Sequence, residues 1–196
     1  LPSLRDFYVA LVSARFEAPA DAIVDERFFL ARIDTLMGMA RLEDARTLLT
    51  DAGTEKPERF RRYFDIGLLT STEATACDII EDTPEVSPTF PARVFCLARN
   101  GEWDVAALTL GTAEAPGILT QQEDQPQARF LDPDLFEGDP VPPVEAMSPL
   151  LFRLYEAIGE RPLTEPLPVA FAVADLSENV GWKDRLCPQY PANDCH

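Results

Sequence analysis

The chain has 196 residues, of which 46% are hydrophobic and 26% are charged, and its formal net charge is −17 at pH 7. A folded chain of this length hides roughly 70% of its unfolded surface, and this share of apolar residues is sufficient for such a core. The acidic excess argues against a nucleic-acid partner, because that affinity depends on cationic side chains that displace condensed counterions. One compact domain or a short repeat array is predicted.

No membrane span is predicted, because the longest apolar runs, such as residues 163–176, reach about half of a bilayer span and contain acids and prolines. The chain begins with Leu1 and shows no charged segment followed by an apolar one. We therefore interpret it as a processed or excised piece, and a signal peptide outside this sequence stays open.

Helical periodicity dominates residues 1–112. The first predicted helix follows Ser3 as its N-cap and carries an apolar stripe at i, i+3, i+4, i+7 and i+8, formed by Leu4, Phe7, Tyr8, Leu11 and Val12. Three helical hairpins are predicted after it. Their apolar stripes lie at 29–40 and 42–52, at 57–68 and 76–80, and at 90–99 and 103–111.

The second helix of each hairpin has a small residue three positions after its first residue. These pairs are Leu42 with Ala45, Glu73 with Ala76, and Trp103 with Ala106, and the alanines recur at intervals of 31 and 30 residues. A small side chain there lets two helices approach closely. We therefore predict that these positions pack the repeats together.

Residues 41–45 and 101–106 carry a resemblance to the tetratricopeptide (TPR) family of helical repeats, which extends over about residues 27–112. The usual TPR unit has about 34 residues and a fuller set of aromatic and small positions than any unit here. The resemblance implies an all-α superhelix, a short solenoid of antiparallel hairpins. An irregular helical bundle remains the alternative.

The C-terminal half is richer in proline, since 12 of the 18 prolines follow residue 110. Residues 113–147 are predicted to be an irregular connection rich in proline and acids, with one short helix between a capping box at 120–123 and Leu131, and an extended linker at 132–143. Residues 148–186 are predicted to pack further helices on the array. The first runs from Ser148 to Ile158, and one covers 163–175 despite its strand-like alternation. Ser177 is expected to cap the last helix, and residues 187–196 form a tail.

The cysteines raise two hypotheses. Cys77 and Cys96 lie at similar heights on adjacent antiparallel helices, so they form either a disulfide or two small buried hydrophobic residues. Cys187, Asp194, Cys195 and His196 gather in the tail, where a zinc site or a Cys187–Cys195 disulfide is conceivable. We interpret this cluster as an ordinary chain terminus and predict neither metal nor cofactor.

Catalytic signatures are weak. The single histidine is terminal, and no nucleophile elbow or phosphate-binding glycine loop occurs. Paired carboxylates are abundant, but no apolar segment beside any pair predicts a pocket that would raise a pKa. The acids at 132, 134, 137 and 139 fit a solvated linker better than a calcium-binding loop. Met37 and Met39 are assigned to core packing in preference to a ligand groove. We predict a protein that is not an enzyme.

Arg59, Arg61 and Arg62 form the densest basic patch. They could contact an acidic partner or a carboxylate terminus, but we favour their assignment to the solvated face of an amphipathic helix.

Two functions remain. The first is a non-catalytic scaffold that binds a protein or peptide ligand. The negative net charge of the chain would favour a basic ligand. The alternative is a module of a cell-envelope enzyme that acts on glycans through paired carboxylates. A periplasmic or secreted location is expected, with the cytoplasm left open, and the oligomeric state is not predicted.

Overall fold

The computed structural model describes residues 3–14, 26–114, 121–141, 144, 146–160, 162 and 166–172. Regular structure in these residues is helical, with no strand, which confirms the predicted all-α class. The helices are α1 (Leu4–Ser13), α2 (Arg27–Gly38), α3 (Leu42–Ala52), α4 (Pro57–Thr70), α5 (Ala74–Asp82), α6 (Phe90–Arg99), α7 (Trp103–Glu114), α8 (Gln121–Leu131) and α9 (Pro149–Ala157). Two short 3-10 turns are η1 (Pro84–Val86) and η2 (Pro133–Phe136).

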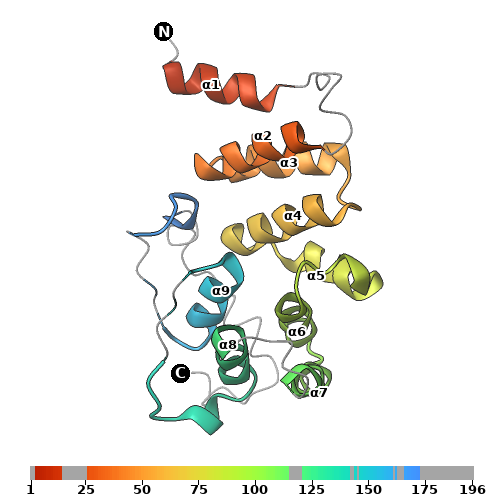
Figure 1. Ribbon diagram of the computed structural model, residues 1–196, viewed down its shortest axis with the longest axis vertical. Coiled ribbons are helices and arrows are strands. Elements are labelled where there is room, and N and C mark those ends of the chain that lie inside the picture. The colour runs from red at the N-terminus through yellow and green to blue at the C-terminus, as the bar shows by residue number, and fades with distance from the viewer. Residues whose placement is uncertain are drawn as a thin grey trace.

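The three predicted hairpins correspond to α2 with α3, α4 with α5, and α6 with α7. Successive helices from α1 to α7 pack on one another, so the array runs from α1 at the top of Figure 1 to α7 near the bottom. The last two helices do not extend it. Helix α8 packs on α6 and α7, and α9 packs on α4 and α8, so the C-terminal half folds back along the array.

Side chains at the helix starts explain where several helices begin. Ser3 caps α1 in a capping box with Asp6, Thr89 caps α6, and Ser148 caps α9, each accepting a hydrogen bond from a backbone N–H in the first turn. Proline occupies the first turn of α4, α6 and α9, where its missing N–H costs nothing. The predicted caps Ser3 and Ser148 are confirmed.

Helix α4 lies between two apolar clusters. Phe60, Phe64 and Leu68 join a cluster with α5, α6, α7, α8 and α9, whereas Ile66 and Leu69 join a second cluster with α2, α3 and α9. All five side chains are buried. Because α4 contributes to both clusters, the two apolar clusters meet at this helix.

Buried arginine ties α9 to the end of α4. The guanidinium of Arg153 donates hydrogen bonds to the carbonyl of Leu68 and to the Ser71 hydroxyl, and it forms an ion pair with Glu156. Ser71 ends α4 in the left-handed conformation, with φ of 57°. A cation on the last carbonyls of a helix satisfies groups that lack an intrahelical partner. Arg153 therefore holds α9 against the C-terminal end of α4.

Two C-terminal predictions differ from the structure. In the described part of 163–175, helical geometry covers only residues 170–172, after a turn that contains Pro166 and Pro168. Proline disfavours the helical region for the residue before it, so the longer helix was a wrong prediction there. The extended linker predicted at 132–143 is wrong in its described part, because residues 133–136 form η2. Arg129 donates hydrogen bonds to the carbonyls of Asp139 and Pro140 in the same segment. The predicted helix after Ser177 and the tail at 187–196 lie outside the described residues.

None of the helices in the described part of the chain combines the length and the hydropathy of a membrane span.

Gly67 of α4 lies close to the backbone that precedes α5. A Cβ added at Gly67 would lie 3.1 Å from the Cα atom of Glu73 and 3.3 Å from its backbone nitrogen. Backbone atoms cannot rotate away as a flexible side chain can. Glu73 is also held in place by an ion pair with Arg99 and by the hydrogen bond that its carbonyl accepts from Cys77.

Substitution of Gly67 with alanine is expected to destabilise the protein. Overpacking costs about 1–3 kcal/mol and exceeds the gain of up to about 1 kcal/mol in helix propensity, so the free energy of unfolding should fall by about 1 kcal/mol. Gly111→Ala on α7, where a new Cβ meets nothing within 4 Å, is the control and should stabilise. Urea denaturation measures both. Equal stabilisation by the two alanines would contradict the close approach.

A disulfide joins α5 to α6. The structure places Cys77 and Cys96 with their Cα atoms 5.0 Å apart and both residues buried, across 19 positions of sequence. Replacing both by alanine should lower the free energy of unfolding by about 3 kcal/mol, because the cross-link restricts the unfolded chain. Denaturation with and without reductant measures the loss. Alkylation of Cys77 and Cys96 in protein purified without reductant, followed by mass spectrometry, would contradict the bond.

Candidate functional site

A surface cavity of about 420 Å³ lies where α4 meets the starts of α6 and α9. Its apolar lining comes from Phe64 on α4, from Leu150, Leu151 and Leu154 on α9, and from prolines 88, 91 and 149. Its charged groups, Arg61 and Asp65, both belong to α4. Pockets that bind small groups in proteins are of this size and are mostly apolar, with a few polar groups that set orientation.

Helical spacing brings the two charges to one side of α4. Residues 61 and 65 are one turn apart, so their side chains project from the same face of the helix, next to Phe64. The hydroxyls of Thr89 and Ser148 also line the cavity, but each already accepts a hydrogen bond from its own helix, from Ala92 and Leu151 respectively. Arg61 and Asp65 are therefore the polar side chains of the cavity best placed to meet a ligand.

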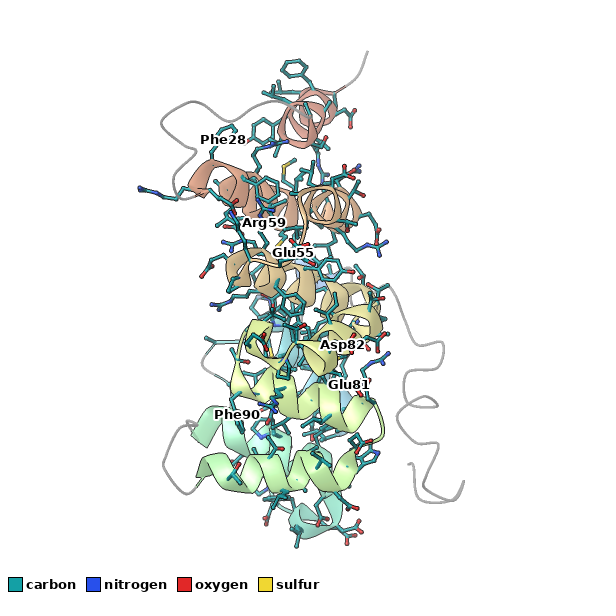
Figure 2. The ribbon with its side chains drawn as sticks, turned by 90° about the vertical axis from the view of Figure 1, so that its right-hand side faces the viewer. Phe28, Glu55, Arg59, Glu81, Asp82 and Phe90 are labelled. Atoms are coloured by element: carbon teal, nitrogen blue, oxygen red, sulfur yellow. A yellow bond between two sulfur atoms is a disulfide. The ribbon has the colours of Figure 1, made fainter. Side chains whose placement is uncertain are left out.

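The three arginines of the predicted patch have different surroundings. Arg59 (Figure 2) forms an ion pair with Glu26 and donates hydrogen bonds to the carbonyls of Ala52 and Gly53. Its guanidinium carbon lies 5.1 Å from the centroid of the Phe29 ring. Arg62 makes a bidentate contact with Asp34, at 2.6 and 2.8 Å. These two connect α4 to the first hairpin and its flanks.

Arg61 differs from its two neighbours. It is exposed, and the described residues provide it with no hydrogen bond or ion pair beyond its electrostatic interaction with Asp65. Only one of the three predicted contact residues thus keeps its guanidinium available at a cavity.

Asp65 has an unusual environment for a carboxylic acid. Burial beside apolar side chains raises its pKa to about 6, and the positive charges of Arg61 and Arg62 only partly offset that effect. No hydrogen bond from a described residue stabilises its charged form. The side chain is therefore able to change protonation state near neutral pH, and it can act as a donor when protonated or as an acceptor when ionised.

The chemistry that the cavity can support is limited by its composition. Among the described residues that line it, Asp65 is the sole carboxylic acid, whereas hydrolysis of a glycoside by the usual mechanism needs two at roughly 5–9.5 Å. No group of three or more histidine, cysteine or acidic residues in the described chain is arranged to hold a metal ion. The arrangement best fits recognition of an apolar group that has a polar edge.

The predicted repeat-packing residues belong to the two apolar clusters. Leu42, Ala45, Ala76 and Ala106 are buried, and Trp103 is half-buried with its ring 5.5 Å from that of Phe130. Met37 is half-buried against the second cluster. The acids of the linker, Asp132, Asp134, Glu137 and Asp139, are exposed. The tail cysteines and His196 lie outside the described residues.

Sequence reasoning predicted α9 and its cap Ser148 but did not place its N-terminal region at a cavity, and it missed Asp65 and the buried Arg153. Asp65 follows the apolar pair Tyr63 and Phe64 on α4, and an acid within such a stretch is a weak signal of partial burial. No signal in the sequence places residues 146–154 beside it, because that contact joins segments more than 80 residues apart.

Comparisons with protein-family models, curated protein sequences and solved structures gave no significant match to this chain.

The raised pKa of Asp65 predicts a specific pH dependence of stability. The fold favours the protonated form of Asp65, so its contribution to the free energy of unfolding is fully present below its unfolded pKa near 4. That contribution is lost as the pH rises through about 6. The uncharged amide of Asp65→Asn does not ionise, so this variant keeps its stability as the pH rises. Relative to the wild type, this variant should gain on the order of 2 kcal/mol in unfolding free energy between about pH 4.5 and pH 7.5.

Denaturation of both proteins across this pH range measures the gain. The control is Asp78→Asn, which removes an exposed acid from the middle of α5. If the stabilities of Asp65→Asn and wild type change in parallel with pH, the desolvation of Asp65 is refuted.

Proposed function

We propose that this protein is a non-catalytic helical scaffold that binds a peptide or a segment of a partner protein. One apolar side chain of the ligand enters the cavity between α4, α6 and α9. The observation that carries the proposal is the composition of that cavity, in which leucine, phenylalanine and proline walls surround one arginine and one acid. An apolar anchor in a pocket with a polar rim is the usual way in which a short peptide segment gains affinity.

Arg61 and Asp65 suit the backbone of a peptide. A guanidinium donates hydrogen bonds to a carbonyl oxygen, and a carboxylate accepts one from an N–H. The two groups are one helical turn apart, so they can meet neighbouring polar groups of an extended ligand while its side chain fills the apolar part of the cavity. The net charge of −17 further favours basic ligands, since long-range attraction raises their rate of association.

The TPR-like superhelix remains part of this proposal. Its support is the succession of three helical pairs with buried alanines at matching positions. Phe152 of α9, together with Ala170 and Phe171, packs against α2 and α4 in the second cluster. Ligand binding is therefore assigned to the cavity rather than to the face of α2 and α4 that the C-terminal half covers.

A periplasmic or secreted location is proposed as well. The buried Cys77–Cys96 bond supports it, because disulfides persist in oxidising compartments and are rare in the cytosol.

Selection from a random peptide library displayed on phage, with the full chain as bait, tests the function. Ala146→Trp places a large side chain at an exposed position on the cavity wall, and Ala107→Trp places the same side chain at an exposed position on α7. Enriched peptides should bind the wild type and Ala107→Trp alike. Their affinity for Ala146→Trp and for Arg61→Ala should fall at least about tenfold, or 1.4 kcal/mol.

Fluorescence anisotropy with labelled peptides measures these affinities. Failure to enrich any peptide, or equal binding to Ala146→Trp and Ala107→Trp, would refute the proposed cavity function.

A further inference from the structure

Asp65 lines the cavity between α4, α6 and α9 without the hydrogen bonds that a carboxylate in such a place normally accepts. Its side chain is partly buried next to the apolar wall formed by Phe64, and no described residue donates a hydrogen bond to it. Arg61, one turn away on α4, acts on it through charge alone. A carboxylate that has lost water and gained no donor is a poor place for a negative charge.

The charged groups that act on Asp65 belong to its own helix. Arg61 and Arg62 both favour its ionised form. Arg62 is divided among several acids, because it forms ion pairs with Asp34 of α2 and with Glu58 of α4. Arg61 is therefore the one of the two that faces the cavity together with Asp65.

In the described residues, α6 and α9 present no charge to Asp65 across the cavity. The residues that these helices and the segments before them contribute to its lining are prolines, leucines, an alanine, a serine and a threonine. Arg93 of α6 lines a different cavity. On α9, Arg153 donates to a carbonyl at the end of α4, and Tyr155 interacts with Arg129. A donor for Asp65 has to come from a ligand.

A peptide in the cavity supplies such a donor in its backbone N–H. The fold already places Asp65 beside apolar side chains, so much of the desolvation that opposes its charge precedes binding. A hydrogen bond from an N–H to a carboxylate is roughly twice as strong as one between neutral groups. The carbonyls of the same peptide segment are within the chemistry of Arg61, which leaves the N–H for Asp65. Ligand binding and ionisation of Asp65 therefore favour each other.

We propose that the cavity holds the backbone N–H of its peptide through ionised Asp65 and releases the peptide when this acid is protonated. The inference rests on the proposed function of the cavity and adds its regulation. In the free protein the pKa of Asp65 is about 6, so the change falls between neutral and mildly acidic pH. If the N–H lowers this pKa to about 5 or less in the complex, the affinity falls at least about fivefold from about pH 7.5 to about pH 5.

The test uses peptides selected on the full chain from a library that omits histidine, aspartate and glutamate, with both termini blocked, so that the ligand does not titrate. Fluorescence anisotropy at the two pH values should show the loss of affinity for the wild type and for Asp78→Asn, which removes an exposed acid. Asp65→Asn keeps an oxygen that accepts an N–H but does not ionise. Its affinity should be the same at both pH values.

N-methylation of the peptide identifies the donor. Methylation of one backbone nitrogen beside the apolar anchor should weaken binding to the wild type at neutral pH and remove the pH dependence. Persistence of the pH dependence in every singly methylated peptide would overturn the assignment of a backbone N–H to Asp65.

The remaining outcomes separate this inference from the function on which it rests. Peptides that Ala146→Trp excludes, but that bind the wild type equally at both pH values, would overturn the inference and leave the cavity function intact. An equal loss of affinity in Asp65→Asn would also overturn it, because other groups would then carry the pH effect. If no peptide is enriched, or if Ala146→Trp binds as the wild type does, both proposals fail. Circular dichroism at each pH checks that the variants remain folded.

Discussion

The burial of α4 on two sides is the constraint on which the rest of the structure depends. Its five buried large side chains are divided between two clusters, so the hairpin of α2 and α3 and the C-terminal helix α9 are both held by the same 14-residue helix. Arg59 and Arg62 connect this helix to acids of the N-terminal part, and Arg153 connects its end to α9. The cavity lies where α9 meets α4 and the start of α6, and residues of all three segments line it.

Charge has two roles that act at different distances. At short range, Arg59 and Arg62 form ion pairs with Glu26 and Asp34. Arg61 and Asp65 are the charged residues that line the cavity. At long range, the uncompensated −17 charges set which partners approach. For this reason a basic ligand is favoured, whereas the proposed contacts that hold it in the cavity are an apolar anchor and the two charged residues of α4.

Helix α1 illustrates the limit of periodicity as a guide to burial. Val9 and Val12 pack against the second cluster, whereas the other four residues of the predicted apolar stripe are exposed, namely Leu4, Phe7, Tyr8 and Leu11. The exposed residues obey the same helical spacing as core residues, so periodicity alone cannot separate a covered face from an uncovered one. Contacts of Arg5 and Arg32 with backbone carbonyls hold α1 in this orientation.

Local information in the sequence was enough for the helices, since apolar spacing, the caps Ser3 and Ser148, and prolines in first turns act within a few residues. It also suggested the Cys77 and Cys96 pair, because two adjacent antiparallel helices are related by their short connection. The position of α9 was decided only by tertiary structure, through contacts between segments more than 80 residues apart, such as Arg153 with Leu68. For the same reason the sequence could neither bring Asp65 to a cavity nor show which face of α1 would stay exposed, because both depend on how distant helices pack.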